Sequence, residues 1–102
     1  MNTLEEIKEQ IKNNSILLYM KGNLNYPRCG FSDQASKIIL KYTKKCKYID
    51  VLKHSNIRRE LPKFSNWPTF PQLWVHGKLI GGCSIIIKMS ETGELKKILE
   101  KI

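Results

Sequence analysis

The chain opens with a pattern typical of an amphipathic helix. Leu4, Ile7 and Ile11 recur at helical spacing, so one face of this segment is apolar. Thr3 and Glu6 form a capping box, and we expect Thr3 to be the N-cap residue. The pattern therefore predicts a first helix that buries one face and ends near residues 13–14.

A strand, a helix and a second strand follow. Residues 16–20 are a continuous apolar run, as in a strand that is buried on both faces. Residues 21–28 contain Gly22 and Pro27 and predict a loop. The apolar residues of the next segment fall on one helical face: Phe31, Ala35, Ile38, Ile39 and Tyr42. Residues 47–51 predict a second strand, so this part of the chain forms a βαβ unit.

The next segments predict a short helix and a hairpin. Residues 57–61 form a polar stretch with the character of a short helix. Residues 72–75 and 78–80 flank the turn dipeptide His76-Gly77, which favours two antiparallel strands.

Two helical segments complete the chain. We expect one to begin at about Ser84, with Ser84 as its N-cap residue. The last helix has its apolar residues on one face: Leu95, Ile98, Leu99 and Ile102. The order α-βαβ-α-ββ-α predicts one α/β domain over residues 1–102, with a four-stranded mixed sheet flanked by helices, similar to the plan of thioredoxin.

Composition narrows the class of protein. The net charge is +9, but 15 of the 18 basic residues are Lys, whereas nucleic-acid-binding surfaces favour Arg and exposed aromatic residues, so a nucleic-acid partner is not expected. No apolar run approaches the roughly 18–20 residues that span a membrane. The N-terminus does not resemble a signal peptide, and the 3 cysteines are widely spaced. These features favour a cytoplasmic protein without a membrane segment.

Cys29 is the strongest candidate for chemistry. It lies between a loop that contains proline and the start of an amphipathic helix, where free backbone N–H groups and the helix dipole favour the thiolate. Lys21 can add a positive charge. A two-cysteine redox site would have its second thiol at Ser32, and a hydroxyl cannot resolve a mixed disulfide. Cys29 must therefore use an external thiol or act as a metal ligand, unless it is an inert packing residue.

Two further segments have both a functional and a structural interpretation. Pro71 enters a strand, which costs a backbone donor. A cis Phe70–Pro71 bond would turn the Phe70 backbone outward to pair with an extended peptide, whereas a trans bond would make an ordinary turn. Residues 81–84, Gly-Gly-Cys-Ser, either admit a ligand carboxylate to backbone amides or form a simple loop and cap.

Together these segments resemble the monothiol glutaredoxins over nearly the whole chain, in the short single-domain form found in bacteria. The motifs are Lys21-Gly22, Pro27-x-Cys29-Gly30-Phe31-Ser32, Trp67-Pro68-Thr69-Phe70-Pro71-Gln72 and Gly81-Gly82-Cys83. The resemblance implies a thioredoxin-like fold, glutathione binding and a 2Fe–2S cluster assembled between two subunits.

The resemblance also implies a role for individual residues. Cys29 is the catalytic thiol and the protein ligand of the cluster. The implied glutathione-binding residues are Lys21 and Arg58 for the glycine carboxylate, Phe70 through its backbone, and Gly82, Cys83 and Ser84 for the γ-glutamyl end. The family usually has Asp after Gly-Gly-Cys, and Ser84 replaces its carboxylate with a neutral hydroxyl. We expect this to cost about 1 kcal/mol of binding free energy.

The sequence thus predicts a carrier of 2Fe–2S clusters, with a glutathione-dependent thiol–disulfide oxidoreductase as the alternative. Four thiolates hold such a cluster, and two Cys29 and two glutathione sulfurs supply them in a symmetric homodimer. The cluster-free chain is expected to be a monomer. BolA-type proteins and iron–sulfur client proteins are the further partners that the resemblance implies. The long loop 21–28, which accompanies weak reductase activity in the family, favours the carrier.

Three other side chains carry expectations. Cys83 can bond to Cys29 if their Cα atoms lie within about 7 Å, but we expect it to pack beside the site without a catalytic role. Cys46 is expected to lie far from the site without a role. Phe31 is expected mostly in the core, with some shielding of the cluster.

Overall fold

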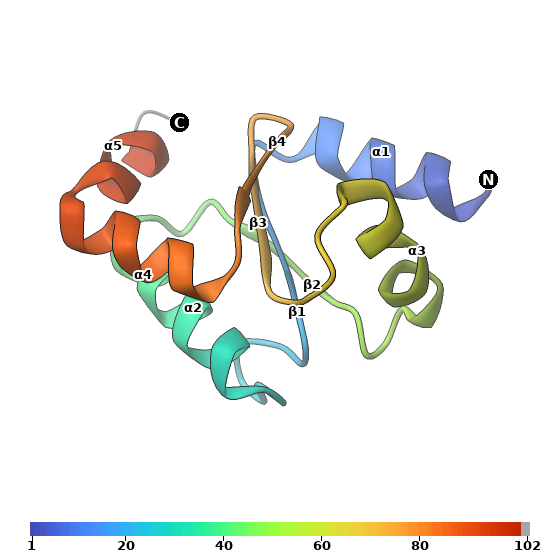
Figure 1. Cartoon of the computed structure of the whole chain (residues 1–102), viewed down its shortest axis with the longest axis horizontal. Helices are drawn as coiled ribbons and strands as arrows, with labels where there is room; N and C mark the ends of the chain where they lie inside the picture. The colour runs from blue at the N-terminus through green and yellow to red at the C-terminus, as the bar shows by residue number, and fades with distance from the viewer. Residues whose placement is uncertain (101–102) are drawn as a thin grey trace.

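The computed structural model describes residues 1–100, which form a four-stranded sheet with helices on both faces (Figure 1). The elements are α1 (Thr3–Asn13), β1 (Ile16–Met20), α2 (Gly30–Tyr42), β2 (Lys47–Asp50), α3 (Ser55–Ser65), β3 (Gln72–Val75), β4 (Lys78–Gly81), α4 (Cys83–Thr92) and α5 (Glu94–Glu100). Within these residues, no helix is long and apolar enough to cross a membrane.

The sheet has the strand order β2-β1-β3-β4. β1 pairs in parallel with β2, whereas β1 with β3 and β3 with β4 are antiparallel pairs. This mixed sheet confirms the predicted thioredoxin-like plan. The last helical region is divided at Gly93, whose φ of 85° lies in the left-handed region, so α4 and α5 are separate helices.

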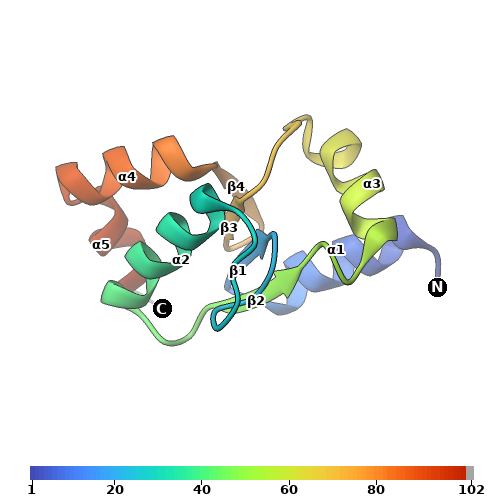
Figure 2. The same ribbon diagram turned by 90° about the horizontal axis from the view of Figure 1, so that it is seen from below.

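β1 is buried throughout because helices cover both faces of the sheet. Ile16, Leu18 and Met20 face the core beneath α2, α4 and α5. Leu17 and Tyr19 face the second core, beneath α1 and α3. Figure 2 shows these two groups of helices on opposite sides of the sheet. The prediction that the apolar run 16–20 is buried on both faces is confirmed.

The N-cap of α1 differs from the prediction. Asn2, not Thr3, is the cap, and its Oδ1 accepts a hydrogen bond of 2.9 Å from the Glu5 N–H. Asn serves this position as well as Ser or Thr does, and it lies one residue earlier. The Thr3 hydroxyl and the Glu6 carboxylate instead accept from the Asn56 side-chain amide at 3.1 and 3.4 Å. The expected capping residues therefore attach α1 to α3.

α3 is longer than the predicted helix of residues 57–61. Ile57 and Leu61 are buried and mark its inner face, but the helix extends from Ser55 to Ser65 with Pro62 inside it. It ends at Asn66, which has a left-handed φ of 53°. The apolar pair revealed the buried stripe but not the ends of the helix.

The apolar face of the last predicted helix is confirmed for its described part. Leu95 and Leu99 of α5 are buried against the core beneath α2 and α4, and Ile98 packs beside them. The fourth residue of that face, Ile102, lies outside the described residues.

Candidate functional site

Cys29 is the N-cap residue of α2, as the sequence predicts. Its backbone is extended, and its carbonyl accepts from the Asp33 N–H at 2.9 Å. The backbone N–H of Ser32 is the main cause that lowers the pKa of the Cys29 thiol below its usual value, against an opposing effect of burial. The Phe31 N–H, the Lys21 ammonium and the Ser32 hydroxyl lower this pKa further. Cys29 is thus a partly exposed thiol whose thiolate is favoured.

Ser32 stands where a two-cysteine site would have its second thiol. It is fully buried, and its Oγ accepts a hydrogen bond of 3.0 Å from the backbone N–H of Lys21. This contact joins the first turn of α2 to the end of β1. The sequence identified Ser32 by what it lacks, and the contact could not be seen from the sequence.

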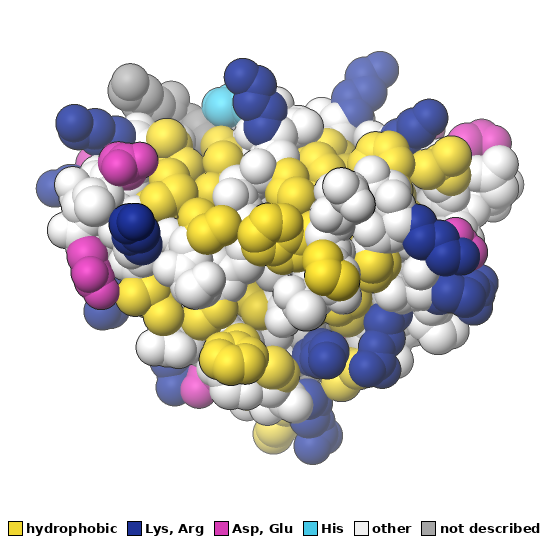
Figure 3. Space-filling view, viewed as in Figure 1, with side chains coloured by type: hydrophobic (Ala, Val, Ile, Leu, Met, Phe, Trp, Pro, Cys, Tyr) yellow, Lys and Arg dark blue, Asp and Glu magenta, His cyan; other side chains and the backbone are white. Residues whose placement is uncertain are grey.

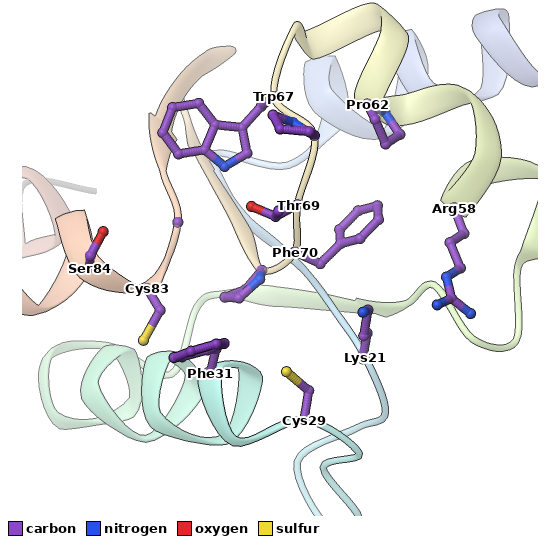
Figure 4. A pocket seen from close by; sticks show the side chains of 13 residues that line it. Lys21, Cys29, Phe31, Arg58, Pro62, Trp67, Thr69, Phe70, Cys83 and Ser84 are labelled. Atoms are coloured by element: carbon purple, nitrogen blue, oxygen red, sulfur yellow. The ribbon is translucent and has the colours of Figure 1, made fainter.

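A pocket of about 650 Å³ opens in front of Cys29 (Figure 4). Its walls come from the end of β1, the start of α2, α3, the segment that precedes β3 and the start of α4. The lining residues are Lys21, Cys29, Phe31, Arg58, Pro62, Trp67, Pro68, Thr69, Phe70, Pro71, Gly82, Cys83 and Ser84. Every site residue proposed from the sequence is among them.

The pocket is cationic at one end. Lys21, directly after β1, and Arg58, on α3, line it together although they are far apart in the sequence. No carboxylate side chain belongs to the lining, and within residues 1–100 neither cation forms an ion pair. In the space-filling view, other Lys and Arg side chains gather on the α3 side of this face (Figure 3). An anionic ligand therefore suits this end of the pocket.

The Phe70–Pro71 peptide bond is cis, as one of the two interpretations of this segment requires. Gln72, fully buried at the start of β3, braces the preceding residues. Its side-chain amide donates to the Trp67 carbonyl at 2.9 Å and to the Thr69 carbonyl at 3.3 Å. Sequence reasoning missed this role, for which the one available signal was a glutamine at the start of an apolar strand.

At the start of α4, Gly82 is the N-cap residue, so the prediction that Ser84 is the cap was wrong. Gly82 has extended backbone, and its carbonyl accepts from the Ile86 N–H at 3.0 Å. A Cβ on Gly82 would lie 3.3 Å from the Pro71 carbonyl and 3.4 Å from Trp67 Nε1. Space is therefore tight behind this residue. Ser84, two residues further along, is exposed, lines the pocket and has no capping role.

Phe31 was also predicted wrongly. Its side chain is 65% exposed, although its spacing placed it on the apolar face of α2. It belongs to the first turn of the helix, and the buried stripe begins only with Ser32 and Ala35. In Figure 4 its ring lies between the thiols of Cys29 and Cys83 at the pocket edge.

The three cysteines have different surroundings. Cys83 is a buried free thiol 3.6 Å from Gln34 Oε1, and its pKa is raised by burial and by the nearby Cys29. Cys29 and Cys83 both line the pocket, and both are free thiols. Cys46 packs against the core beneath α2 and α4, outside the pocket, and burial raises its pKa to about 12.

Residues 21–28 form a loop, as predicted, and its residues 22–28, called the excursion below, begin and end beside Lys21. The Arg28 N–H donates to the Lys21 carbonyl at 3.0 Å, and Gly22 pairs with Pro27 as an antiparallel bridge. Gly22 has a φ of 92°, and a Cβ there would collide with the backbone of the excursion, so only glycine fits. The excursion therefore begins and ends beside the pocket, with a defined conformation.

The fold and the reactive thiol at the start of α2 define a thiol protein of the thioredoxin-like class. A sequence profile of the family described as glutaredoxin matches residues 16–80. The protein named glutaredoxin 4 of Buchnera aphidicola subsp. Schizaphis graminum is 57% identical, over 97% of this chain and 92% of its own.

Solved structures agree. Reduced apo GrxS14 of poplar is 32% identical with a TM-score of 0.80, over 96% of this chain and 90% of its own. A buckwheat glutaredoxin–glutathione complex is 20% identical, with a TM-score of 0.83, over 96% of this chain and 87% of its own, and shares the fold. The chain belongs to the glutaredoxin family, and to its monothiol branch with Ser32 in place of a second cysteine.

Proposed function

We propose that this protein binds glutathione in the pocket and uses the Cys29 thiolate, together with glutathione, to hold and pass on a 2Fe–2S cluster as its cargo. The observation that carries the proposal is the pairing of a favoured thiolate at Cys29 with a hydrogen-bonded hydroxyl at Ser32. Because Ser32 offers no second thiol and the pKa of the Cys83 thiol is raised, we infer that the partner thiol comes from outside the chain, and glutathione is the thiol tripeptide that the family uses.

The pocket suits glutathione in size and charge. Its volume of about 650 Å³ lies in the usual range of small-molecule sites. We assign the glycine carboxylate to Lys21 and Arg58, the two unpaired cations of the lining. We assign the backbone of Phe70, which lines the pocket beside the cis proline, to pair with the extended peptide as an added strand does. This arrangement would direct the glutathione sulfur towards Cys29.

The γ-glutamyl end belongs at the start of α4. The N–H groups of the first turn of a helix have no partners within the helix and attract a carboxylate. We assign this carboxylate to the backbone near Gly82 and Cys83. The Ser84 hydroxyl faces the ammonium group, where a carboxylate is usual in the family. Recognition of this end therefore rests mostly on backbone groups.

The cluster needs ligands from two chains. A 2Fe–2S cluster takes four thiolates, and among the described residues no three His, Cys, Asp or Glu side chains gather at one point. Two Cys29 thiolates and two glutathione sulfurs complete the set across a symmetric homodimer. We propose a homodimer with the cluster and a monomer without it.

A second candidate function is glutathione-dependent thiol–disulfide exchange. The lowered pKa of Cys29 favours it, because a thiolate is the attacking species in both roles. In this role the Cys29 thiolate would attack the glutathione sulfur of a glutathionylated substrate and release the substrate thiolate. A free glutathione thiolate would then attack the glutathione sulfur of the Cys29–glutathione disulfide, which frees Cys29 and forms glutathione disulfide. The two functions share the site. The carrier is isolated as a cluster-bound dimer, whereas the oxidoreductase is a cluster-free monomer.

The remaining assignments follow from this function. We propose that residues 1–102 act as one domain in the cytoplasm, where glutathione is abundant and thiols stay reduced. Iron–sulfur client proteins, and BolA-type proteins as known for the family, are the proposed protein partners. Nucleic acid is not proposed as a partner.

Anaerobic reconstitution with iron, sulfide and glutathione tests the proposal. We expect a coloured protein that elutes as a dimer, with about one glutathione per chain, and that loses its colour when glutathione is removed. A colourless monomer that rapidly reduces a glutathionylated peptide would contradict the carrier function and support the oxidoreductase.

A further inference from the structure

Ser32 makes a contact that its neighbours on α2 do not make. Its side chain is 0% exposed, yet its hydroxyl oxygen reaches out of the helix to accept from the Lys21 N–H at 3.0 Å. The residue lies in the first turn of α2, three positions after Cys29. A single buried hydroxyl therefore connects the helix that carries the thiol with the strand end that carries a pocket cation.

Lys21 directly precedes the excursion 22–28, and the last residue of the excursion, Arg28, returns beside it. Its N–H is held by Ser32, and its carbonyl accepts from the Arg28 N–H at 3.0 Å. The next residue, Gly22, donates its N–H to Asp50 Oδ1 at 2.9 Å. Both backbone polar groups of Lys21 are thus fixed, one to α2 and one across the base of the excursion.

This backbone arrangement decides where the Lys21 side chain points. Lys21 lines the pocket between Cys29 and Arg58, and its ammonium is one of two unpaired cations there (Figure 4). Lysine has a long, flexible side chain, so its position depends strongly on the backbone from which it starts. Without the bond to Ser32, the N–H of Lys21 would need another partner and the strand end would be free to move.

We propose that Ser32 is a positioning residue, whose buried hydroxyl fixes the backbone of Lys21 so that the Lys21 ammonium stays in the pocket to bind the ligand carboxylate. The identity of that ligand rests on the proposed function, whereas the contact between Ser32 and Lys21 does not. The position after Cys29-Gly30-Phe31 thus has a task of its own in this chain.

The chemistry of the side chain explains why serine suits this task. A hydroxyl is a good acceptor of a backbone N–H, while a thiol is a weak one and an alanine is none. Residue 32 can therefore serve as a second thiol or as a firm anchor for Lys21, but not as both. A Ser32→Cys chain would gain the resolving thiol and loosen the cation.

Ser36 provides a matched control. It lies one turn further along α2, is 3% exposed, and donates its hydroxyl to the Asp33 carbonyl of the same helix at 3.0 Å. Ser36→Ala therefore removes a buried serine hydroxyl from α2 without touching the pocket.

The experiment is a double-mutant cycle on the reduced, cluster-free chain, with S-methylglutathione as a probe that cannot exchange thiols. Affinity is measured by titration calorimetry for wild type, Ser32→Ala, Lys21→Gln, the double variant and Ser36→Ala. We expect Ser32→Ala and Lys21→Gln each to weaken binding about tenfold. The double variant should bind about as weakly as Lys21→Gln alone, because the hydroxyl acts through the ammonium. Ser36→Ala should bind like wild type.

Two results from the Ser32 variants would overturn the proposal. One is a Ser32→Ala chain that binds like wild type, and the other is a double variant whose loss is the full product of the two single losses. A Ser32→Thr chain, which keeps the hydroxyl, should recover most of the affinity. A loss of affinity in Ser36→Ala equal to that in Ser32→Ala would also reject a specific role.

Amide hydrogen exchange in the wild-type chain judges the proposal if Ser32→Ala does not fold or if the probe does not bind. We expect the Lys21 amide to be as well protected as the amides inside β1, because it donates a hydrogen bond to the Ser32 hydroxyl. Rapid exchange at Lys21 would show that the contact does not persist. A wild-type chain that binds no S-methylglutathione but protects Lys21 would reject the proposed function and keep the anchor.

Discussion

Cys29 and Cys46 flank the same helix and have opposite properties. Cys29 caps the N-terminus of α2, where backbone N–H groups lower its thiol pKa. Cys46 follows the C-terminus of α2 and packs against the core, where burial raises its thiol pKa to about 12. The comparison shows that the residue type alone does not make a reactive thiol; the end of the helix and access to solvent decide it.

The rest of each environment agrees with this difference. Around Cys29 the chain places a pocket, two unpaired cations and the start of a second helix, α4. At Cys46 the Sγ donates to the neighbouring Lys47 carbonyl at 3.4 Å. Burial outweighs the effects of the Tyr48 side chain and the Leu18 backbone, which lower the pKa of the Cys46 thiol. A cation or an N–H donor stabilises a thiolate, whereas a carbonyl oxygen does not. The two thiols should therefore differ strongly in reactivity, although both belong to cysteines that flank the same helix.

The largest expected difference is in reactivity. The thiolate fraction at neutral pH should favour Cys29 over Cys46 by orders of magnitude, since the pKa of the Cys29 thiol is lowered whereas burial raises that of Cys46 to about 12. The Cys29 rate should fall as pH drops through its lowered pKa, and level off above it. The Cys46 rate should still rise at pH 10. Iodoacetamide labelling of the reduced chain, read by peptide mass spectrometry, checks this.

Similar labelling rates at neutral pH would contradict the comparison. Cys83, with a raised pKa beside the pocket, provides an internal reference, and we expect its rate to lie well below that of Cys29.

The next effect concerns the cations near Cys29. Arg58→Gln should weaken glutathione binding about tenfold, because it removes a charge that lines the pocket. Arg59→Gln is the matched control, since Arg59 contacts Glu60 at 3.4 Å and does not line the pocket. Calorimetric titration compares the two variants. Equal losses would mean that the general positive charge of α3, and not a defined contact, attracts the ligand.

A smaller effect is expected at the start of α4. Ser84→Asp should tighten glutathione binding several-fold, or about 1 kcal/mol, because a carboxylate would then face the ligand ammonium. Ser84→Asn, which is similar in size and neutral, should change little. If both variants bind alike, the ammonium does not lie beside residue 84 and the orientation assigned to glutathione is wrong.

The smallest expected effect is on stability, for which Cys46 should matter more than Cys29. Cys46→Ser should lower the free energy of unfolding by about 1 kcal/mol, because it places a hydroxyl in an apolar, half-buried site. Cys29→Ser should change it by less than about 0.5 kcal/mol. Urea unfolding of both variants measures this. A larger loss from Cys29→Ser would mean that its thiol supports the fold as well as the chemistry.

The sequence predicted the fold well where the signal is local. The apolar run of β1 and the turn dipeptide at His76-Gly77 each specify their element without help from distant residues. The position of Cys29 at a helix start follows from the same local pattern. The resemblance to the family then indicated the remaining pocket residues, which local patterns could not have shown to lie together.

The errors occurred where neighbouring residues compete or where distant contacts decide. Asn2 and Thr3 are both good caps, and Gly82 and Ser84 both precede helical residues, so spacing could not choose between them. Phe31 is exposed because the core lies one position further along the helix. The contact of Ser32 with the end of β1 joins residues 11 positions apart and became visible only in the structure.

The central claim is that Cys29, and not Cys46, holds the cluster, and one measurement tests it most directly. Wild type, Cys29→Ser and Cys46→Ser are reconstituted side by side with iron, sulfide and glutathione, and their visible absorption and circular dichroism are recorded. We predict a full iron–sulfur spectrum for wild type and Cys46→Ser, and none for a folded Cys29→Ser chain. A full spectrum in Cys29→Ser, or its loss in Cys46→Ser, would contradict the account.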